Sequence, residues 1–256
     1  MIPPGRLAVI LLLSRSERFV VMRGFALLVI LTSSAAASAE NKPWIDLMKP
    51  DVWSKFDERW IATDTVKLDE KNSKKLIAEK VDKGTVWVNG PGRVANLITK
   101  QEFADCEIEI EFLIAKGSNA GVKFHSLYEI QILDTFGKDV KTLTGNSMGG
   151  IYPRARNGPP YGYEDDGTPP KVNAANKPGE WNKLTATWKA PRFDAAGKLT
   201  EHGIVVRAEL NGKLIHDNVT VKTPTGANWV KPNTAKGLFM VQADHGPTAI
   251  RLLRIR

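Results

Sequence analysis

Apolar and polar residues alternate along most of the chain after about residue 85, and this alternation predicts β-strands rather than helices. The clearest case is the stretch 106–114, in which Glu107, Glu109 and Glu111 alternate with apolar residues. Successive side chains of a strand point to opposite faces, so the pattern is typical of a strand buried on one side. No basic residues lie in register with the three glutamates nearby, and we therefore expect them to form a solvated outer face.

Further short stretches with this alternation are separated by turn residues. Asn211-Gly212 is the strongest hairpin signal among them, because a type I′ turn requires positive φ at both central positions. The stretch 67–80 is the one place where we expect a short helix. The many short strands predict an all-β fold, a sandwich of two antiparallel sheets. The strands expected after residue 85 are 86–88, 94–98, 106–114, 121–125, 128–134, 182–189, 204–210, 213–216, 237–243 and 249–255.

Two neighbouring strands, 121–125 and 128–134, carry polar residues on one face and apolar residues on the other. Only two residues separate them, which is short enough for a hairpin connection. If the strands pair, an ammonium, an imidazole, a carboxylate and an amide gather on one sheet face, with Asp134 where the second strand ends. A plain solvated face has the same pattern, and polarity alone favours that interpretation. The four residues of this cluster are Lys123, His125, Glu129 and Gln131.

A second polar group follows near the end of the chain, at Gln242, Asp244 and His245. Strands distant in sequence could bring both groups to one concave sheet face, where they would bind sugar hydroxyls and transfer protons. Between the groups lies a long segment, 153–181, that is rich in Pro, Gly and Tyr. Its aromatic residues, together with Arg154, suit the wall of a sugar-binding cleft, and a rigid surface flap is the equal alternative.

The first 39 residues are typical of a targeting segment rather than of a folded domain. Met22-Arg23 precedes a short apolar run, and small residues ending in Ala37-Ser38-Ala39 follow it, as in a secretory signal peptide. We expect translation from Met22, cleavage before Glu40, and a secreted or periplasmic protein with no membrane segment after cleavage. Residues 40–256 then form a single domain.

Composition narrows the classes of function. The chain has 256 residues, one cysteine and a net charge of +8, and residues 1–39 account for four of its arginines and one glutamate. The remaining positive charge is mild and spread along the chain, so we expect no nucleic-acid partner. Cys106 lies among alternating apolar residues, which indicates core packing. The four histidines are not spaced as a multi-histidine metal site, and no nucleotide-binding loop is present.

Several motifs together resemble the 3-keto-disaccharide hydrolase domain family over nearly all of the chain after residue 39. The resemblance implies a concanavalin-like or LamG-like jelly-roll sandwich that acts on oxidised sugars. The matching segments are 44–47, 89–97, 102–107, 117–122, 128–134, 149–153, 179–181, 210–212 and 242–246.

The resemblance implies a hydrolase or lyase of 3-keto-glucosides or 3-keto-disaccharides. A 3-keto group acidifies the hydrogen at C2, so a base can remove it, the glycosidic oxygen can leave from C1, and water can then add. This route needs a base, an acid and a group that stabilises the enolate. The residues expected to act in catalysis are His125 or Glu129 as the base, with Asp134. Those expected to hold the substrate are Lys123 or His245 near the enolate oxygen, and Gln131, Tyr152, Arg154 and Gln242 at hydroxyls.

The sequence requires no cofactor, although Glu129 and Asp134 could supply oxygen ligands to a divalent cation. The alternative function is a non-catalytic, lectin-like carbohydrate-binding module, since this fold is shared by proteins of many functions. A binding module favours exposed aromatic residues in its groove, whereas the ionisable groups expected here favour an enzyme. The expected partner is a carbohydrate in both cases.

Overall fold

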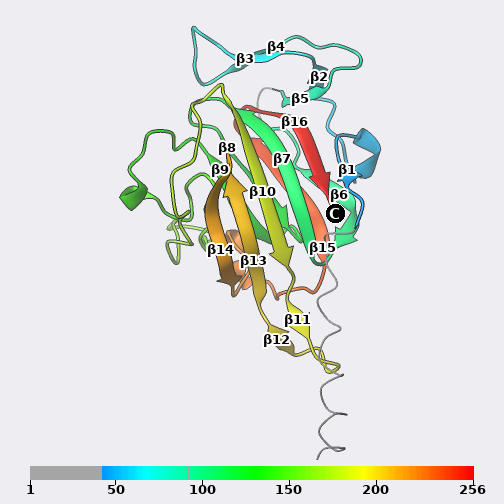
Figure 1. The fold of residues 1–256 in the computed structure, drawn as a ribbon, viewed down its shortest axis with the longest axis vertical. Helices are drawn as coiled ribbons and strands as arrows, with labels where there is room; N and C mark the ends of the chain where they lie inside the picture. The colour runs from blue at the N-terminus through cyan, green and yellow to red at the C-terminus, as the bar shows by residue number, and fades with distance from the viewer. Residues whose placement is uncertain (1–41, 91–92) are drawn as a thin grey trace, which may run out of the picture. The chain divides into compact units, whose positions relative to one another are not determined.

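The strands pair into two antiparallel sheets that pack face to face (Figure 1). The computed structural model describes residues 42–90 and 93–256. The strands of the larger sheet, in spatial order, are β14 (Lys213–Val221), β13 (Gly203–Leu210), β10 (Trp181–Lys189), β7 (Cys106–Ile114), β16 (Thr248–Ile255), β5 (Val86–Asn89) and β2 (Trp60–Thr63), with β1 (Ile45–Asp46) paired to β16. The smaller sheet consists of β6 (Leu97–Phe103), β15 (Gly237–His245), β8 (Asn119–Phe124) and β9 (Tyr128–Leu133). The predicted two-sheet sandwich is confirmed.

Two small hairpins lie outside these sheets, and one of them replaces the helix expected at 67–80. That segment contains β3 (Val66–Leu68) paired with β4 (Leu76–Ala78). The Asp69 carboxylate accepts hydrogen bonds from Lys71 N at 2.8 Å and Asn72 N at 3.2 Å. Such side-chain bonds to the backbone favour a turn over a helix, so the helix prediction is wrong. The other hairpin pairs β11 (Arg192–Phe193) with β12 (Leu199–Glu201).

Helical structure in the described part of the chain is limited to short 3₁₀ segments. They are η2 (Pro50–Val52), η3 (Val140–Thr142) and η4 (Ala227–Val230). Over residues 42–90 and 93–256, no helix is long and apolar enough to cross a membrane. The predicted signal peptide and its cleavage site lie outside the described residues.

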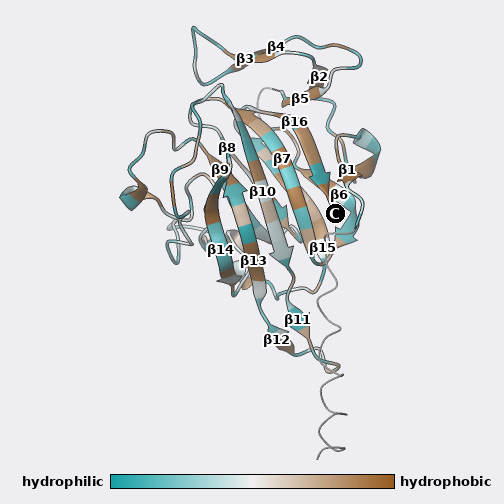
Figure 2. Cartoon of the chain, in the orientation of Figure 1, coloured by the Kyte–Doolittle hydropathy of each residue, from teal (hydrophilic) through white to brown (hydrophobic). Residues whose placement is uncertain are grey.

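The inner faces of the two sheets form one hydrophobic core. Apolar and polar residues follow one another along β7 in Figure 2, and Ile110 and Phe112 on its inner face are fully buried. Phe124 of β8 stacks on Trp188 of β10 with ring centroids 5.2 Å apart, which joins the two layers. Burial of each such side chain stabilises the fold by roughly 2 kcal/mol. The core therefore sets the spacing of the sheets whose outer faces carry the charged residues.

The three glutamates of β7 lie on the outer face as expected, but the expectation that they have no basic partners is wrong. Glu109 lies opposite Arg254 of β16 and forms ion pairs with Arg254 and with Lys183 of β10. Glu107 pairs in the same way with Arg256, and Glu111 with Arg251. The arginines follow the glutamates by about 140 residues, and a register shift in β16 breaks their strict alternation. Neither feature can be read from the local pattern around β7.

The Asn211-Gly212 hairpin prediction is confirmed. Both residues have positive φ, 52° and 73°, as a type I′ turn requires. Leu210 of β13 pairs with Lys213 of β14 across the turn.

Candidate active site

The β8–β9 hairpin places an ion pair on the outer face of the smaller sheet. Lys123 lies directly opposite Glu129, and its Nζ is 2.9 Å from Glu129 Oε2. The neighbouring residues Val122 and Ile130 point into the core, so alternation puts the two charged side chains on the opposite face. The Glu129 side chain is 2% exposed and that of Lys123 is 15% exposed. The carboxylate is therefore covered, while the ammonium lies nearer to solvent.

Gly121 makes room for the Glu129 carboxylate. A Cβ atom at this position would lie 2.3 Å from Glu129 Oε1, which is closer than any real contact. Only glycine in the middle of β8 therefore lets the carboxylate lie flat over the neighbouring strand. Sequence reasoning missed this residue, although a glycine inside a strand pattern is itself a signal of close approach.

Burial raises the pKa of Glu129 above its ordinary value. The Lys123 ammonium opposes this rise, the His245 imidazole acts in the same direction, and the negative charge of Asp244 adds to the rise. Two members of the second polar group thus lie close enough to affect the Glu129 carboxylate. The groups that are far apart in the sequence meet on one sheet face.

The end of β15 supplies an imidazole anchored by a carboxylate. His245 Nδ1 lies 2.6 Å from Asp244 Oδ1 and 3.0 Å from Gln242 Nε2. Gln242 pairs with Gly121 of β8, so this group lies on the strand next to the one that carries Lys123. When Nδ1–H donates to Asp244, Nε2 is left as a proton acceptor. The His245 side chain is 40% exposed, so this nitrogen can reach a ligand.

The turn after β15 is held in place by Asn89 of the larger sheet. The Asn89 Nδ2 group donates to the carbonyls of Ala243 and Gly246, each at 2.8 Å. Its Oδ1 accepts a hydrogen bond from Thr248 N at 2.6 Å. One buried amide therefore fixes the backbone on both sides of His245.

Tyr152 borders the ion pair on the β9 side. Its backbone N–H donates to the Glu129 carbonyl at 3.0 Å, and its hydroxyl lies 3.2 Å from that of Tyr163. Burial raises the pKa of the Tyr152 hydroxyl, and Tyr163 and the Glu129 charge raise it further. The phenol therefore keeps its proton over a wide pH range and can act as a hydrogen-bond or proton donor.

Gln131 lies on the predicted sheet face, but it is fully buried because residues 146–150 cover it. Its Nε2 donates to Asn146 Oδ1 at 2.6 Å, and its Oε1 accepts a hydrogen bond from Ile132 N at 3.2 Å. The Gln131 backbone also exchanges hydrogen bonds with Gly149 and Gly150. The amide holds the covering segment in place and does not open onto the sheet face as expected.

His125 does not share this face, and that prediction is wrong. His125 and Ser126 have φ of 54° and 56° and form the turn between β8 and β9, so the alternation ends at Phe124. The imidazole turns to the core side, edge-on to Tyr128 and Trp188 at centroid distances of 5.7 and 5.9 Å. Burial lowers its pKa.

The two histidines lie at opposite ends of β15, so the prediction that they share one cleft is also wrong. His125 packs against Gly237, the first residue of β15, whereas His245 is the last residue of that strand. At roughly 3.3 Å per residue, the strand separates the two ends by more than 20 Å.

Asp134 does not join Glu129 either. Its carboxylate accepts hydrogen bonds from Gly117 N at 3.0 Å and Phe136 N at 3.4 Å, and so closes the ends of the hairpin. We predicted that Asp134 acts together with Glu129, either in catalysis or as a second ligand of a cation. The two carboxylates do not lie side by side, so this prediction is wrong. No cluster of three or more metal-ligating side chains occurs in residues 42–90 and 93–256.

Arg154 belongs to the long segment after β9 and lies beside Tyr152 in the chain. It pairs with Asp165 at 2.7 Å and stacks over Trp229 at 5.4 Å from the ring centroid. Tyr152, Arg154 and Asp165 line a cavity of about 330 Å³. Arg154 and Asp165 of the long segment therefore border a cavity next to Tyr152.

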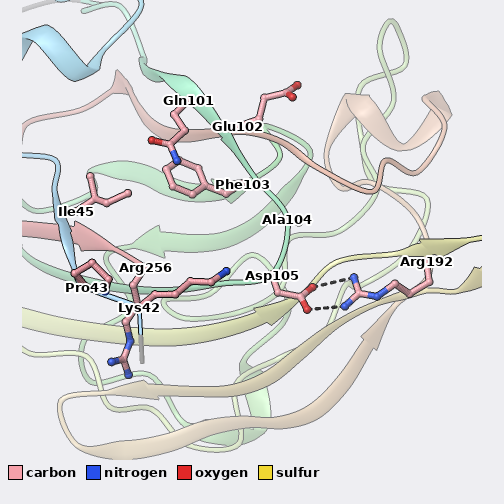
Figure 3. Close-up of a pocket in the computed structure, with 10 residues that line it drawn as sticks. All are labelled: Lys42, Pro43, Ile45, Gln101, Glu102, Phe103, Ala104, Asp105, Arg192 and Arg256. Carbon is pink, nitrogen blue, oxygen red and sulfur yellow. Dashed lines mark hydrogen bonds and ion pairs between the residues drawn. The ribbon is translucent and has the colours of Figure 1, made fainter. Parts of the chain in front are cut away.

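The largest cavity described, about 530 Å³, lies elsewhere (Figure 3). It is lined by residues 101–105 at the end of β6 together with Lys42, Pro43, Ile45, Arg192 and Arg256. The Asp105–Arg192 ion pair closes one side of it, as the dashed lines in Figure 3 show. None of the predicted site residues contributes to this cavity.

The two antiparallel sheets packed on one core place the chain in the class of jelly-roll sandwich proteins. The chain belongs to the 3-keto-alpha-glucoside-1,2-lyase-like domain family, which it matches over residues 46–256. The resemblance stated from the sequence is therefore confirmed. None of the curated protein sequences compared with the chain matches it.

Two solved structures share the fold, and both are described as a "putative glycosyl hydrolase" from Parabacteroides distasonis. The first is 24% identical, with a TM-score of 0.54, and the match covers 83% of each chain. The second is 18% identical, with a TM-score of 0.52, and the match covers 84% of this chain and 99% of the other.

Proposed function

We propose that this protein breaks the glycosidic bond of 3-keto-glucosides or 3-keto-disaccharides outside the cytoplasm, by elimination followed by hydration. Family membership supports this class of substrate. The observation that carries the assignment is a row of groups across the smaller sheet. The Lys123–Glu129 pair lies in the middle, with Asp244–His245 on one side and Tyr152 on the other. A cation thus stands between two groups able to move protons.

His245 Nε2 removes the proton from C2 of the keto sugar. The electrons of the C–H bond form a double bond between C1 and C2 as the bond from C1 to the glycosidic oxygen breaks. That oxygen takes a proton from the Tyr152 hydroxyl. Water then adds across the double bond: its hydroxyl bonds to C1 while its other proton returns to the Tyr152 phenolate oxygen. The His245 imidazolium, whose proton exchanges with solvent, gives a proton to C2. Negative charge on the keto oxygen is stabilised by the Lys123 ammonium during proton removal.

The exposures of the side chains support this division of roles. His245 and Lys123 have surface that a sugar can touch, whereas Glu129 is almost completely covered. Glu129 therefore acts through Lys123, which it holds in position, and Asp244 orients the His245 imidazole in the same way. Of the two bases expected from the sequence, His125 lies in the core and Glu129 lies beneath the ammonium.

The decisive experiment is turnover of 3-keto-trehalose or a 3-keto-glucoside in D₂O, beside the unoxidised sugar. We expect release of monosaccharide from the keto sugar alone, with deuterium at C2 of the product. Release without deuterium at C2 would exclude elimination. Saturable binding of the keto sugar without any release would instead support the non-catalytic carbohydrate-binding alternative.

A further inference from the structure

The cavity beside Tyr152 adjoins the proposed active site without being part of it. It lies between the segment 151–154 and the residues that follow β14, and its volume is about 330 Å³. Tyr152 and Thr225 line it, and both also contact Glu129. The Thr225 hydroxyl oxygen accepts a hydrogen bond from Glu129 N at 3.0 Å, and Tyr152 N donates to the Glu129 carbonyl. A molecule in the cavity is therefore next to the sugar that the Lys123–Glu129 row would hold.

The lining of this cavity is hydroxylic and charged. Thr168, Thr220 and Thr223 contribute side chains, and Lys222 is an exposed lysine that forms no ion pair with any residue the structure describes. Hydroxyls and an ammonium recognise a ligand rich in hydroxyl groups. Polar and apolar atoms contribute about equally to the lining, which suits a sugar ring with its hydroxyl groups and its C–H faces.

The wall of the cavity is rigid. Asp165 accepts hydrogen bonds from Arg154 N at 3.0 Å, Arg154 Nε at 2.7 Å and Gly167 N at 3.1 Å. Because the Arg154 charge is neutralised by Asp165, the Lys222 ammonium is the one cation of the lining without a carboxylate partner among the described residues. A pre-formed polar wall of this kind lowers the entropic cost of binding.

We propose that this cavity binds the second sugar ring of a keto-disaccharide, the ring that departs with the glycosidic oxygen. This inference rests on the proposed function and, of the two substrate classes named there, favours the 3-keto-disaccharides, whose leaving group is itself a sugar. A ring in the cavity places the glycosidic oxygen beside Tyr152, whose hydroxyl can protonate it. Lys222 and Thr223 then donate hydrogen bonds to hydroxyls of the departing ring.

The test compares two substrates, 3-keto-trehalose and methyl 3-keto-α-glucoside, in the double variant Lys222→Met/Thr223→Val. We expect the ratio of kcat/KM for the disaccharide to that for the methyl glycoside to fall about tenfold, mostly through KM, as expected for the loss of hydrogen bonds from a charged and a neutral donor. Lys231→Met, an exposed lysine outside the cavity, is the matched control and should leave the ratio unchanged. An unchanged ratio in the double variant would overturn the proposal.

A binding measurement keeps the cavity separate from the catalytic assignment. Unoxidised trehalose is titrated into the wild-type protein while the methyl signals of Thr168 and Thr220, which the double variant retains, are followed by NMR. We expect saturable shifts that are absent in the double variant. Failure of the wild type to turn over either keto sugar would overturn the proposed function, whereas the absence of shifts at high trehalose concentration would overturn the cavity assignment.

Discussion

The outer faces of the two sheets carry the same kinds of charged residue but differ in how these are covered. On the larger sheet, Glu109 and Glu111 each meet an arginine of β16, and Glu107 meets Arg256 just after it. Trp44 and Trp181 cover those arginines, with the Arg251 guanidinium 4.4 Å from the Trp181 centroid. On the smaller sheet, one ion pair is covered and the neighbouring imidazole is exposed. Ion pairs of this kind stabilise a surface modestly, whereas an exposed imidazole next to a covered ion pair can meet a ligand.

His245→Asn is the substitution that tests the reactive face most severely. If Nε2 of this imidazole removes the C2 proton, turnover of a 3-keto-glucoside should fall roughly 10²–10⁴-fold. Because the side chain is 40% exposed, the fold should survive, which circular dichroism can check. His202→Asn, between β12 and β13, is the matched control. Equal activity in the two variants would remove His245 from the mechanism.

Gly121→Ala should disturb the same face indirectly. A methyl group 2.3 Å from Glu129 Oε1 must displace the carboxylate, and Lys123 with it. We expect turnover to fall at least about tenfold and the free energy of unfolding to drop by about 1–3 kcal/mol. Gly158→Ala is the control, because a Cβ there would meet nothing within 4 Å. Wild-type kinetics in Gly121→Ala would show that the carboxylate position is unimportant.

Asp244→Asn should change the pH dependence of catalysis. The Asp244 charge raises the pKa of Glu129, so its removal should lower that pKa. Glu129 must be ionised to hold Lys123, so the loss of kcat/KM on acidification should begin at a lower pH in the variant. A pH–rate profile with the keto sugar measures this, along with the lower activity expected when the imidazole is no longer oriented. An acid limb that stays in place would contradict the coupling between the two carboxylates.

Glu109→Gln tests the other face, where the effect should be on stability alone. Burial alone would raise the pKa of Glu109, but hydrogen bonds from Lys183 and Arg254 bring it below its ordinary value. The ionised carboxylate therefore stabilises the fold above the ordinary carboxyl pKa, and this contribution is lost as the pH falls through the folded-state pKa. We expect a loss of about 1 kcal/mol at neutral pH, measured by urea unfolding, which should shrink in acid.

Two controls complete this comparison of the faces. Glu111 has a single ion-pair partner, the exposed Arg251. Glu111→Gln should therefore lower the free energy of unfolding by less than about 0.5 kcal/mol. Both variants should turn over the keto sugar as the wild type does. If the loss in free energy of unfolding for Glu109→Gln does not depend on pH, packing rather than charge stabilises this position.

Much of the fold followed from alternation, because period-two patterning is local information. The strands at 106–114 and 182–189 and the Asn211-Gly212 hairpin lie where the pattern predicts them. The pairing of Glu109 with Arg254 could not be predicted in this way, since it depends on which distant strand becomes the neighbour of β7 and on a shift in register.

The candidate site was predictable up to the end of each strand. Alternation correctly put Lys123 and Glu129 on one face, but it extends to His125 only if the backbone stays extended there. Two residues with positive φ turn that imidazole into the core. The cover over Gln131 comes from residues 146–150, whose return to β9 leaves no trace in the pattern of the strand itself.

The Asn89 amide has a consequence for how the molecule tolerates change. Asn89 belongs to a strand of the larger sheet, yet its side chain forms hydrogen bonds with the backbone on both sides of His245, at the end of β15 in the smaller sheet. The imidazole is therefore placed by the distance between the layers, not only by its own strand. Core substitutions that change the distance between the two sheets would therefore move the histidine. Evolutionary change in residues remote from any ligand would alter the chemistry before it altered the fold.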